Sequence, residues 1–218
     1  MKAYVIACSL LCLPAALGGC EPVELTTPIV GDCDSSTSLN RWPQFEGEAP
    51  TADVTGFGIG DVPPNFQLRD QFDEPICLWQ LAGKVVLVDA SAVHCGPCKD
   101  IAKHSACVAD SYGGELVYLT FITQDKAGGK ATLEDAQWWS DTFSLGNGSL
   151  TPVVSDGDTV FTQTAEWVPA APSFMLLDRD MRIVSKASGR SGERVMRDKA
   201  TELLGEPTDE CLPAEEEE

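Results

Sequence analysis

The chain has 218 residues, which suits one domain of ordinary size with terminal segments, and 43% of them are hydrophobic. Its formal net charge is −19, from 34 acidic and 15 basic side chains. We therefore expect no nucleic-acid partner, because phosphate binding requires a basic face. The excess negative charge is expected to favour solubility.

The N-terminus has the pattern of an export signal. Lys2 precedes an apolar run over residues 3–17, and small residues and Cys20 follow. The pattern predicts a signal peptide over residues 1–19, since the run is too short for a comfortable transmembrane helix. The tetrapeptide Leu17-Gly18-Gly19-Cys20 resembles the bacterial lipobox. This resemblance implies that Cys20 carries a lipid and anchors the chain to a membrane. The alternative is an ordinary signal peptide with a cysteine there by chance.

Both ends of the mature chain differ in composition from its middle. Residues 20–55 are rich in Pro, Thr, Ser, Asp and Glu without periodicity, which predicts a lipidated, flexible tether. Within it, Trp42 and Phe45 are candidates to dock on the domain. Residues 207–218 end in four glutamates and predict an acidic tail. The folded domain is therefore expected over residues 56–206.

Strand-like and helix-like segments alternate through this domain. Residues 84–90 (KVVLVDA) form a nearly continuous apolar run, which indicates a central strand buried on both faces. The alternation predicts an α/β layer architecture. Strands are expected over residues 65–70, 76–78, 84–90, 115–123, 173–177 and 182–187, with a short segment at 152–155, and helices over 95–112, 132–143 and 192–204.

The dithiol motif Cys95-Gly96-Pro97-Cys98 follows the central strand and begins a helix. At a helix N-terminus, free N–H groups and the helix dipole stabilise a thiolate and lower the pKa of the cysteine below about 8.5. Cys95 is therefore the expected nucleophile, and Cys98, one turn later, the expected resolving thiol. Pro97 fits the first helical turn, where no N–H is needed, and Gly96 leaves the first sulfur uncrowded for a substrate.

A zinc site would be the competing use of these residues, with ligands drawn from His94, Cys95, Cys98, His104 and Cys107. Nine residues of helix correspond to a rotation of about 900°, which places Cys98 and Cys107 on opposite faces. No metal and no cofactor is therefore expected. A purely structural bond between Cys95 and Cys98 is the other alternative.

Four further cysteines lie outside the signal, the lipobox and the motif: Cys33, Cys77, Cys107 and Cys211. An even number in an exported protein is compatible with two structural disulfides, and four cysteines allow three pairings. A working scheme pairs Cys33 with Cys211, near the two ends, and Cys77 with Cys107.

Residues 60–98 (GDVPPNFQLRDQFDEPICLWQLAGKVVLVDASAVHCGPC) resemble the TlpA/ResA-like branch of the thioredoxin superfamily. The resemblance continues through residues 172–178 (PSFMLLD) to about residue 204 and covers most of the mature chain. It implies a thioredoxin fold, with a central mixed β-sheet flanked by helices and an added N-terminal β-hairpin.

The resemblance also implies three roles beyond the two cysteines. Pro172 matches the cis-proline that lies against the dithiol, and Ala171 would offer its backbone to an extended substrate. Asp89 matches the buried carboxylate of thioredoxin, which would take a proton from Cys98. The alternative for Asp89 is a strand-end aspartate bound to backbone.

Two features of the motif bear on the reduction potential in opposite directions. His94 stands where the family usually has tryptophan, and a cationic imidazole there would make the disulfide more oxidising. An exposed rim position with little effect is the alternative. Gly96 and Pro97, by contrast, match thioredoxin itself, a reductant with a potential near about −270 mV.

The function that this pattern favours is thiol–disulfide exchange on exported proteins. The chain is expected to act at the periplasmic face of a bacterial membrane, as reductant rather than oxidant, with a membrane electron donor. A thiol peroxidase of the peroxiredoxin or glutathione-peroxidase type is one alternative, although position 92, where peroxiredoxins need threonine, is alanine. A non-catalytic thioredoxin-fold binding module is the other.

Overall fold

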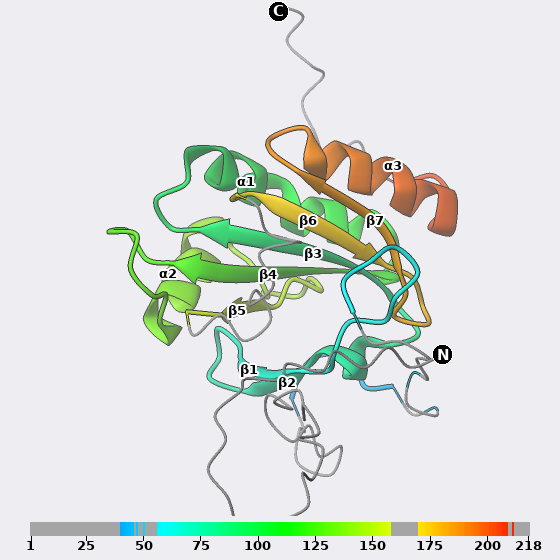
Figure 1. Cartoon of the computed structure of the whole chain (residues 1–218), viewed down its shortest axis with the longest axis horizontal. Helices are drawn as coiled ribbons and strands as arrows, with labels where there is room; N and C mark the ends of the chain where they lie inside the picture. The colour runs from blue at the N-terminus through cyan, green and yellow to red at the C-terminus, as the bar shows by residue number, and fades with distance from the viewer. Residues whose placement is uncertain are drawn as a thin grey trace, which may run out of the picture.

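The computed structural model describes residues 40–45, 47, 50, 56–157, 170–208 and 211. The expected signal peptide, Cys20 and Cys33 lie outside these residues. Two sheets are present, a hairpin of β1 and β2 and a mixed sheet of order β5-β4-β3-β6-β7 (Figure 1). Among the described residues, no helix is long and apolar enough to cross a membrane. The elements are β1 (Gln67–Arg69), β2 (Pro75–Cys77), the 3-10 helix η1 (Leu78–Leu81), β3 (Val85–Ala92), α1 (Gly96–Asp110), β4 (Leu116–Gln124), α2 (Leu133–Phe143), β5 (Val153–Ser155), β6 (Ser173–Leu177), β7 (Ile183–Ser188) and α3 (Gly192–Leu204).

Strand β3 is the centre of the mixed sheet. It pairs in parallel with β4 and antiparallel with β6, and all eight of its residues are buried. The prediction of a strand buried on both faces is therefore confirmed, and the strand extends two residues beyond the expected end. β4 and β5 are also parallel, whereas β6 and β7 form an antiparallel hairpin.

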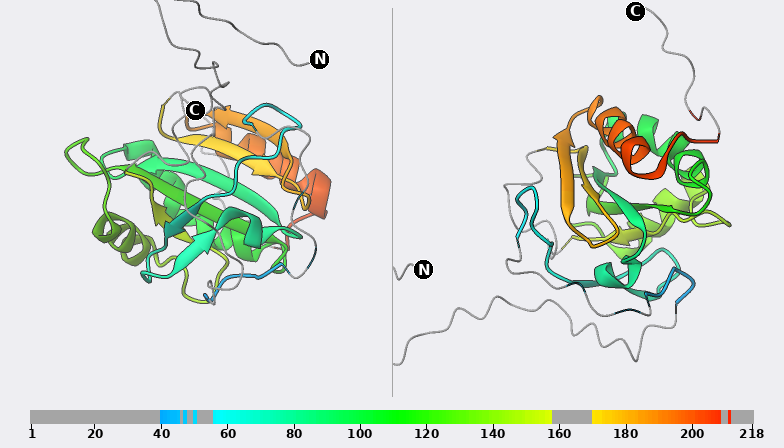
Figure 2. Two further views of the ribbon diagram at one scale, coloured as in Figure 1. Left: turned by 60° about the horizontal axis from the view of Figure 1, so that its bottom comes forward. Right: turned by 90° about the vertical axis from the view of Figure 1, so that its right-hand side faces the viewer.

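The two faces of the mixed sheet are covered by different elements (Figure 2). Because side chains alternate along a strand, Leu87 of β3 packs under α1 and α3, while its neighbour Val88 packs against the hairpin side. Trp139 of α2 packs with Ile122 of β4 on the face that carries α1. The three helices therefore cover one face, and β1, β2 and η1 cover the other. This is a thioredoxin-like fold with the expected added hairpin; η1 was not expected.

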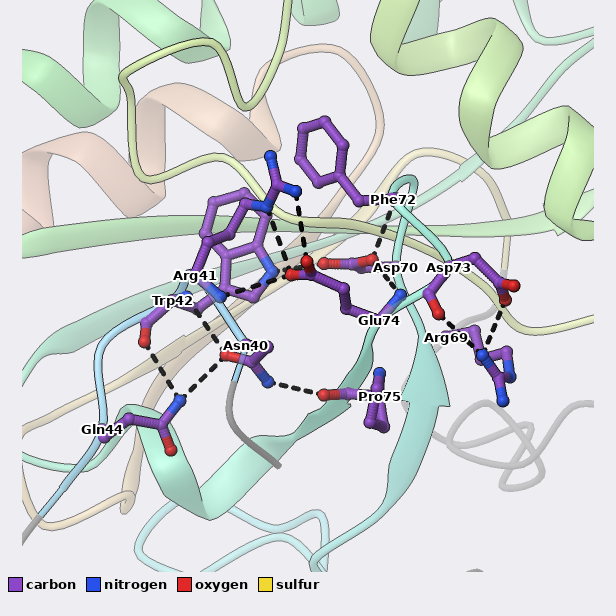
Figure 3. A network of polar contacts seen from close by, with 10 residues as sticks. All are labelled: Asn40, Arg41, Trp42, Gln44, Arg69, Asp70, Phe72, Asp73, Glu74 and Pro75. Atoms are coloured by element: carbon purple, nitrogen blue, oxygen red, sulfur yellow. Dashed lines mark hydrogen bonds and ion pairs between the residues drawn. The ribbon is translucent and has the colours of Figure 1, made fainter. Parts of the chain in front are cut away.

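The segment just before the domain packs against the turn of the hairpin (Figure 3). Trp42 is only 4% exposed, and its indole N–H donates to Asp70 at 2.5 Å. Arg41 stacks over the ring of Phe72 at 3.4 Å and donates to Glu74. The prediction that Trp42 docks is confirmed, and the docked residues lie within the range expected to be a tether.

The working scheme for the structural disulfides is wrong. Cys107 of α1 is bonded to Cys211, with 5.5 Å between their Cα atoms. The C-terminal segment returns along the end of α1, where the backbone N–H of Thr208 donates to the carbonyl of Ser111 at 2.8 Å. Cys77 is also in a disulfide, but its partner lies outside the described residues.

Candidate functional site: a dithiol at the N-terminus of α1

Cys95 and Cys98 are bonded to each other at the point where β3 gives way to α1. Cys95 is the N-cap residue of α1, and its sulfur accepts a hydrogen bond from the backbone N–H of Cys98 at 3.2 Å. Pro97 lies in the first turn, where its missing N–H breaks no helical bond. The sulfur of Cys95 thus lies where the helix dipole and free N–H groups favour negative charge.

The two sulfurs differ in their access to solvent. Cys98 is fully buried and packs with Ala102 and Trp139, whereas Cys95 is half-buried. Gly96 and Pro97 are both exposed, and a Cβ built at position 96 would meet no atom within 4 Å. A partner molecule can therefore reach the sulfur of Cys95 but not that of Cys98.

The segment that contains Pro172 lies beside this disulfide. The peptide bond between Ala171 and Pro172 is cis, and the carbonyl oxygen of Ala171 is 3.6 Å from the sulfur of Cys95. Pairing of β6 with β3, with Ser173 opposite Ala90, brings this segment to the dithiol across 76 residues of sequence.

Asp89 lies within β3 on the face that carries α1, and it is 1% exposed. The hydroxyl of Ser91 donates to its carboxylate at 2.9 Å. Burial raises the pKa of Asp89 from 3.8 to about 7, the Ser91 hydrogen bond opposes the increase, and the charge of Glu193 adds to it. A carboxyl group with a pKa near neutrality can both accept and release a proton under ordinary conditions.

His94 is exposed at the edge of the site, and its Nδ1 lies 3.1 Å from the carbonyl oxygen of Asp125. That carbonyl belongs to the loop between β4 and α2. Since a carbonyl can only accept, Nδ1 carries the proton in this contact. The imidazole ring is therefore held against this loop at the rim of the site.

Several residues that lie beside the site were not identified from the sequence. The Ser91 hydroxyl could have been found from strand alternation, since residues two apart share a face. Trp138 of α2 is 44% exposed, and the ammonium group of Lys99, which follows Cys98, lies 5.7 Å from its ring. Only the packing of α2 beside α1 reveals that contact.

The residues considered as zinc ligands do not gather into a single site. Cys95 and Cys98 bind each other, and Cys107 binds Cys211 on the exposed side of α1. The buried position of Cys98 and the exposed position of Cys107 confirm that they lie on opposite faces. Within the described ranges, no group of three or more His, Cys, Asp or Glu side chains could hold a metal ion.

Comparison with known proteins identifies the fold. No protein-family model and no curated protein matches the chain. Among solved structures, a chain assigned as the thiol:disulfide interchange protein DsbE of Chlorobium tepidum is 19% identical, with a TM-score of 0.57 over 69% of this chain and 100% of its own. The thioredoxin domain of a thiol-disulfide oxidoreductase from Bacteroides vulgatus is 15% identical, with a TM-score of 0.53 over 68% of this chain and 99% of its own.

Peroxidoxin BcpB from Mycobacterium tuberculosis is also similar, at 16% identity and a TM-score of 0.54 over 68% of this chain and 97% of its own. The thioredoxin-like fold is therefore shared with oxidoreductases and with a peroxidoxin. A choice between these activities depends on the site itself.

Proposed function

We propose that the chain is a thiol–disulfide oxidoreductase that reduces disulfides in exported proteins. The observation that carries the proposal is the pairing of an accessible N-cap cysteine with a buried cysteine in the next turn, Cys95 and Cys98. The similarity to two thiol–disulfide exchange proteins supports it. The absence of threonine at position 92 favours it over a peroxidase of peroxiredoxin type.

In the proposed reaction, the reduced protein attacks first through Cys95. Its thiolate bonds to one sulfur of the client disulfide, and the other client sulfur leaves as a thiolate. The carbonyl of Ala171, next to the Cys95 sulfur, is available to a backbone N–H of an extended client segment. Gly96 and Pro97 form the exposed surface against which that segment lies.

Cys98 then resolves the mixed disulfide. Its proton moves to the carboxylate of Asp89, and its thiolate attacks the sulfur of Cys95. The bond between Cys95 and the client breaks, and the client leaves as its second thiolate. The protein is left with the Cys95–Cys98 disulfide that the structure contains. A membrane dithiol donor would return two electrons to this disulfide.

The proposal includes attachment to a membrane through Cys20, with the domain at the periplasmic face. The lipobox-like tetrapeptide is what supports this location. Metabolic labelling with a fatty acid should mark the wild-type protein and not the Cys20→Ser variant. Labelling of both to the same extent, or of neither, would contradict lipidation at this residue.

A trapping experiment tests the exchange activity. The Cys98→Ser variant should accumulate a mixed disulfide with a reducible client, because nothing resolves the bond to Cys95. The Cys95→Ser variant should trap nothing and should not reduce insulin, since the buried Cys98 cannot reach a client. Equal trapping by both variants would contradict the assigned roles.

Two further measurements separate the alternatives. A reduction potential of the Cys95–Cys98 pair close to that of thioredoxin, about −270 mV, supports a reductant, whereas a value near about −120 mV would indicate an oxidant. Rapid peroxide consumption without insulin reduction would favour a peroxidase. A protein that turns over neither substrate would be a binding module.

A further inference from the structure

Glu193 is a second acidic residue with a buried side chain on the face of the sheet that carries Asp89. It lies in the first turn of α3 and is 6% exposed. Nε of Arg197, one turn later, donates to its carboxylate at 2.9 Å. Arg197 is itself 25% exposed, so this ion pair connects a buried carboxylate to the edge of the domain.

Packing places the start of α3 above the strand that pairs with Asp89. A Cβ at Gly192 would come within 2.8 Å of the ring of Phe174, so the backbone of α3 lies directly on that ring. Phe174 is the β6 residue opposite Asp89 in the antiparallel register. α1 and α3 lie over the same face of the sheet, with β3 and β6 beneath them (Figure 1).

Titratable groups from four elements meet in this region. Asp89 comes from β3, Tyr118 from β4, His104 from α1, and Glu193, Arg197 and Asp198 from α3. β6 contributes none, since its sequence is Ser-Phe-Met-Leu-Leu. The hydroxyl of Tyr118 is buried and has no hydrogen-bond partner among the described residues.

The charges in this region act on one another. The negative charge of Glu193 raises the pKa of Asp89, in addition to the larger effect of burial. For Glu193 itself, burial raises the pKa, Arg197 and His104 lower it, and Asp198 raises it. Burial raises the pKa of Tyr118 well above 10, which keeps its hydroxyl neutral, with Asp89 and Glu193 adding to the effect.

We infer that Glu193 is a positioning residue for proton transfer between Cys98 and Asp89, and that Arg197 holds it in place. The inference rests on the proposed function of the dithiol. In this inference Glu193 acts through Asp89, because its negative charge makes the Asp89 carboxylate a stronger base. A stronger base accepts the proton of Cys98 more readily while the Cys98–Cys95 bond forms and the client sulfur departs as a thiolate.

The test is the titration of Asp89 in the oxidised protein, followed by NMR of ¹³C-labelled aspartate carboxyl groups and assigned with Asp89→Asn. In the Glu193→Gln variant the midpoint should move to lower pH by about half a pH unit or more, because a nearby negative charge is lost. The amide that this substitution introduces retains an oxygen that can accept from Arg197, which preserves the local packing.

Glu202→Gln provides the matched control, since Glu202 is an exposed residue of the same helix paired with Lys199. Its Asp89 midpoint should equal that of the wild type. The pH profile of insulin reduction should move with the midpoint in Glu193→Gln alone. An unchanged Asp89 midpoint in Glu193→Gln would overturn the inference, even if insulin reduction were normal. A wild-type protein that reduces no insulin would instead contradict the proposed function, while the NMR titration would still report on Glu193.

Discussion

At the scale of single residues, the two cysteines differ in burial, and this difference is the basis of their proposed roles. Cys95 and Cys98 have the same chemistry, but only Cys95 can be reached from outside. The hydrogen bond from the N–H of Cys98 stabilises negative charge on Cys95 and not on Cys98. In the proposed mechanism Cys98 depends on a base to lose its proton, and the buried carboxyl group of Asp89, with a pKa of about 7, is the proposed base.

We expect Asp89 to lower the free energy of unfolding of the domain, because its position is suited to the proposed proton transfer and not to stability. Its pKa rises from 3.8 to about 7 on folding, a difference of about 3 units. Folding therefore favours the protonated carboxyl, and the cost of the buried charge appears as pH rises from about 4 through about 7. We expect Asp89→Asn to increase the free energy of unfolding by up to about 4 kcal/mol at about pH 8.

Urea denaturation at several pH values checks this expectation. The gain in Asp89→Asn should shrink as pH falls from about 7 towards about 4 and vanish below about pH 3, where the wild-type carboxyl is protonated in both the folded and the unfolded state. Asp141→Asn, an exposed change on α2, should give little difference at any pH. A gain that is the same at acid and alkaline pH would show that packing, not charge, is responsible.

At the scale of elements, the sequence predicts those strands and helices that are determined by a short continuous stretch of residues. The run at residues 84–90 predicts β3 because a nearly continuous run of apolar, β-branched residues is typical of a strand that is buried on both faces. The motif at residues 95–98 predicts the start of α1 because its proline and cysteines fit a first turn. These two elements together position the dithiol.

Contacts between distant segments could not be predicted in the same way. The sequence predicts that Trp42 docks on the domain, but it does not identify the partner, Asp70, which lies 28 residues away. Likewise, the partner of Cys107 depends on where the C-terminal segment returns, which spacing alone does not fix. Glu193 had no signal, because an acidic residue in the first turn of a helix is ordinary there.

Docking of the segment before the domain should contribute to its stability. Trp42 is buried in the core cluster on the hairpin side and donates to the buried Asp70. We expect Trp42→Ala to lower the free energy of unfolding by about 3 to 5 kcal/mol, through lost packing and a weakened polar network. Phe45→Ala is the control in the same segment and should cost much less, since Phe45 is 41% exposed. Equal losses in urea denaturation would contradict the structural account.

At the scale of the whole molecule, two disulfides lie at opposite ends of α1, and we expect them to differ in function. In the proposed function the Cys95–Cys98 bond at the start of α1 takes part in exchange, whereas the Cys107–Cys211 bond ties the other end of α1 to the C-terminal segment. Cys98 faces the core and Cys107 faces solvent. Nine residues of helix separate the two by about 13 Å, so the bonds cannot exchange within a straight helix.

The Cys107–Cys211 bond should act on stability and not on exchange. It closes a loop across 104 residues, and removing it with the double variant Cys107→Ser, Cys211→Ser should cost about 2 to 4 kcal/mol of unfolding free energy. Insulin reduction by the folded double variant should equal that of the wild type. In excess dithiol the wild type loses the same cross-link, so the difference in unfolding free energy should disappear. A difference that persists in dithiol would mean that the substitutions disturb packing around α1, and the constraint on the unfolded chain would not be its cause.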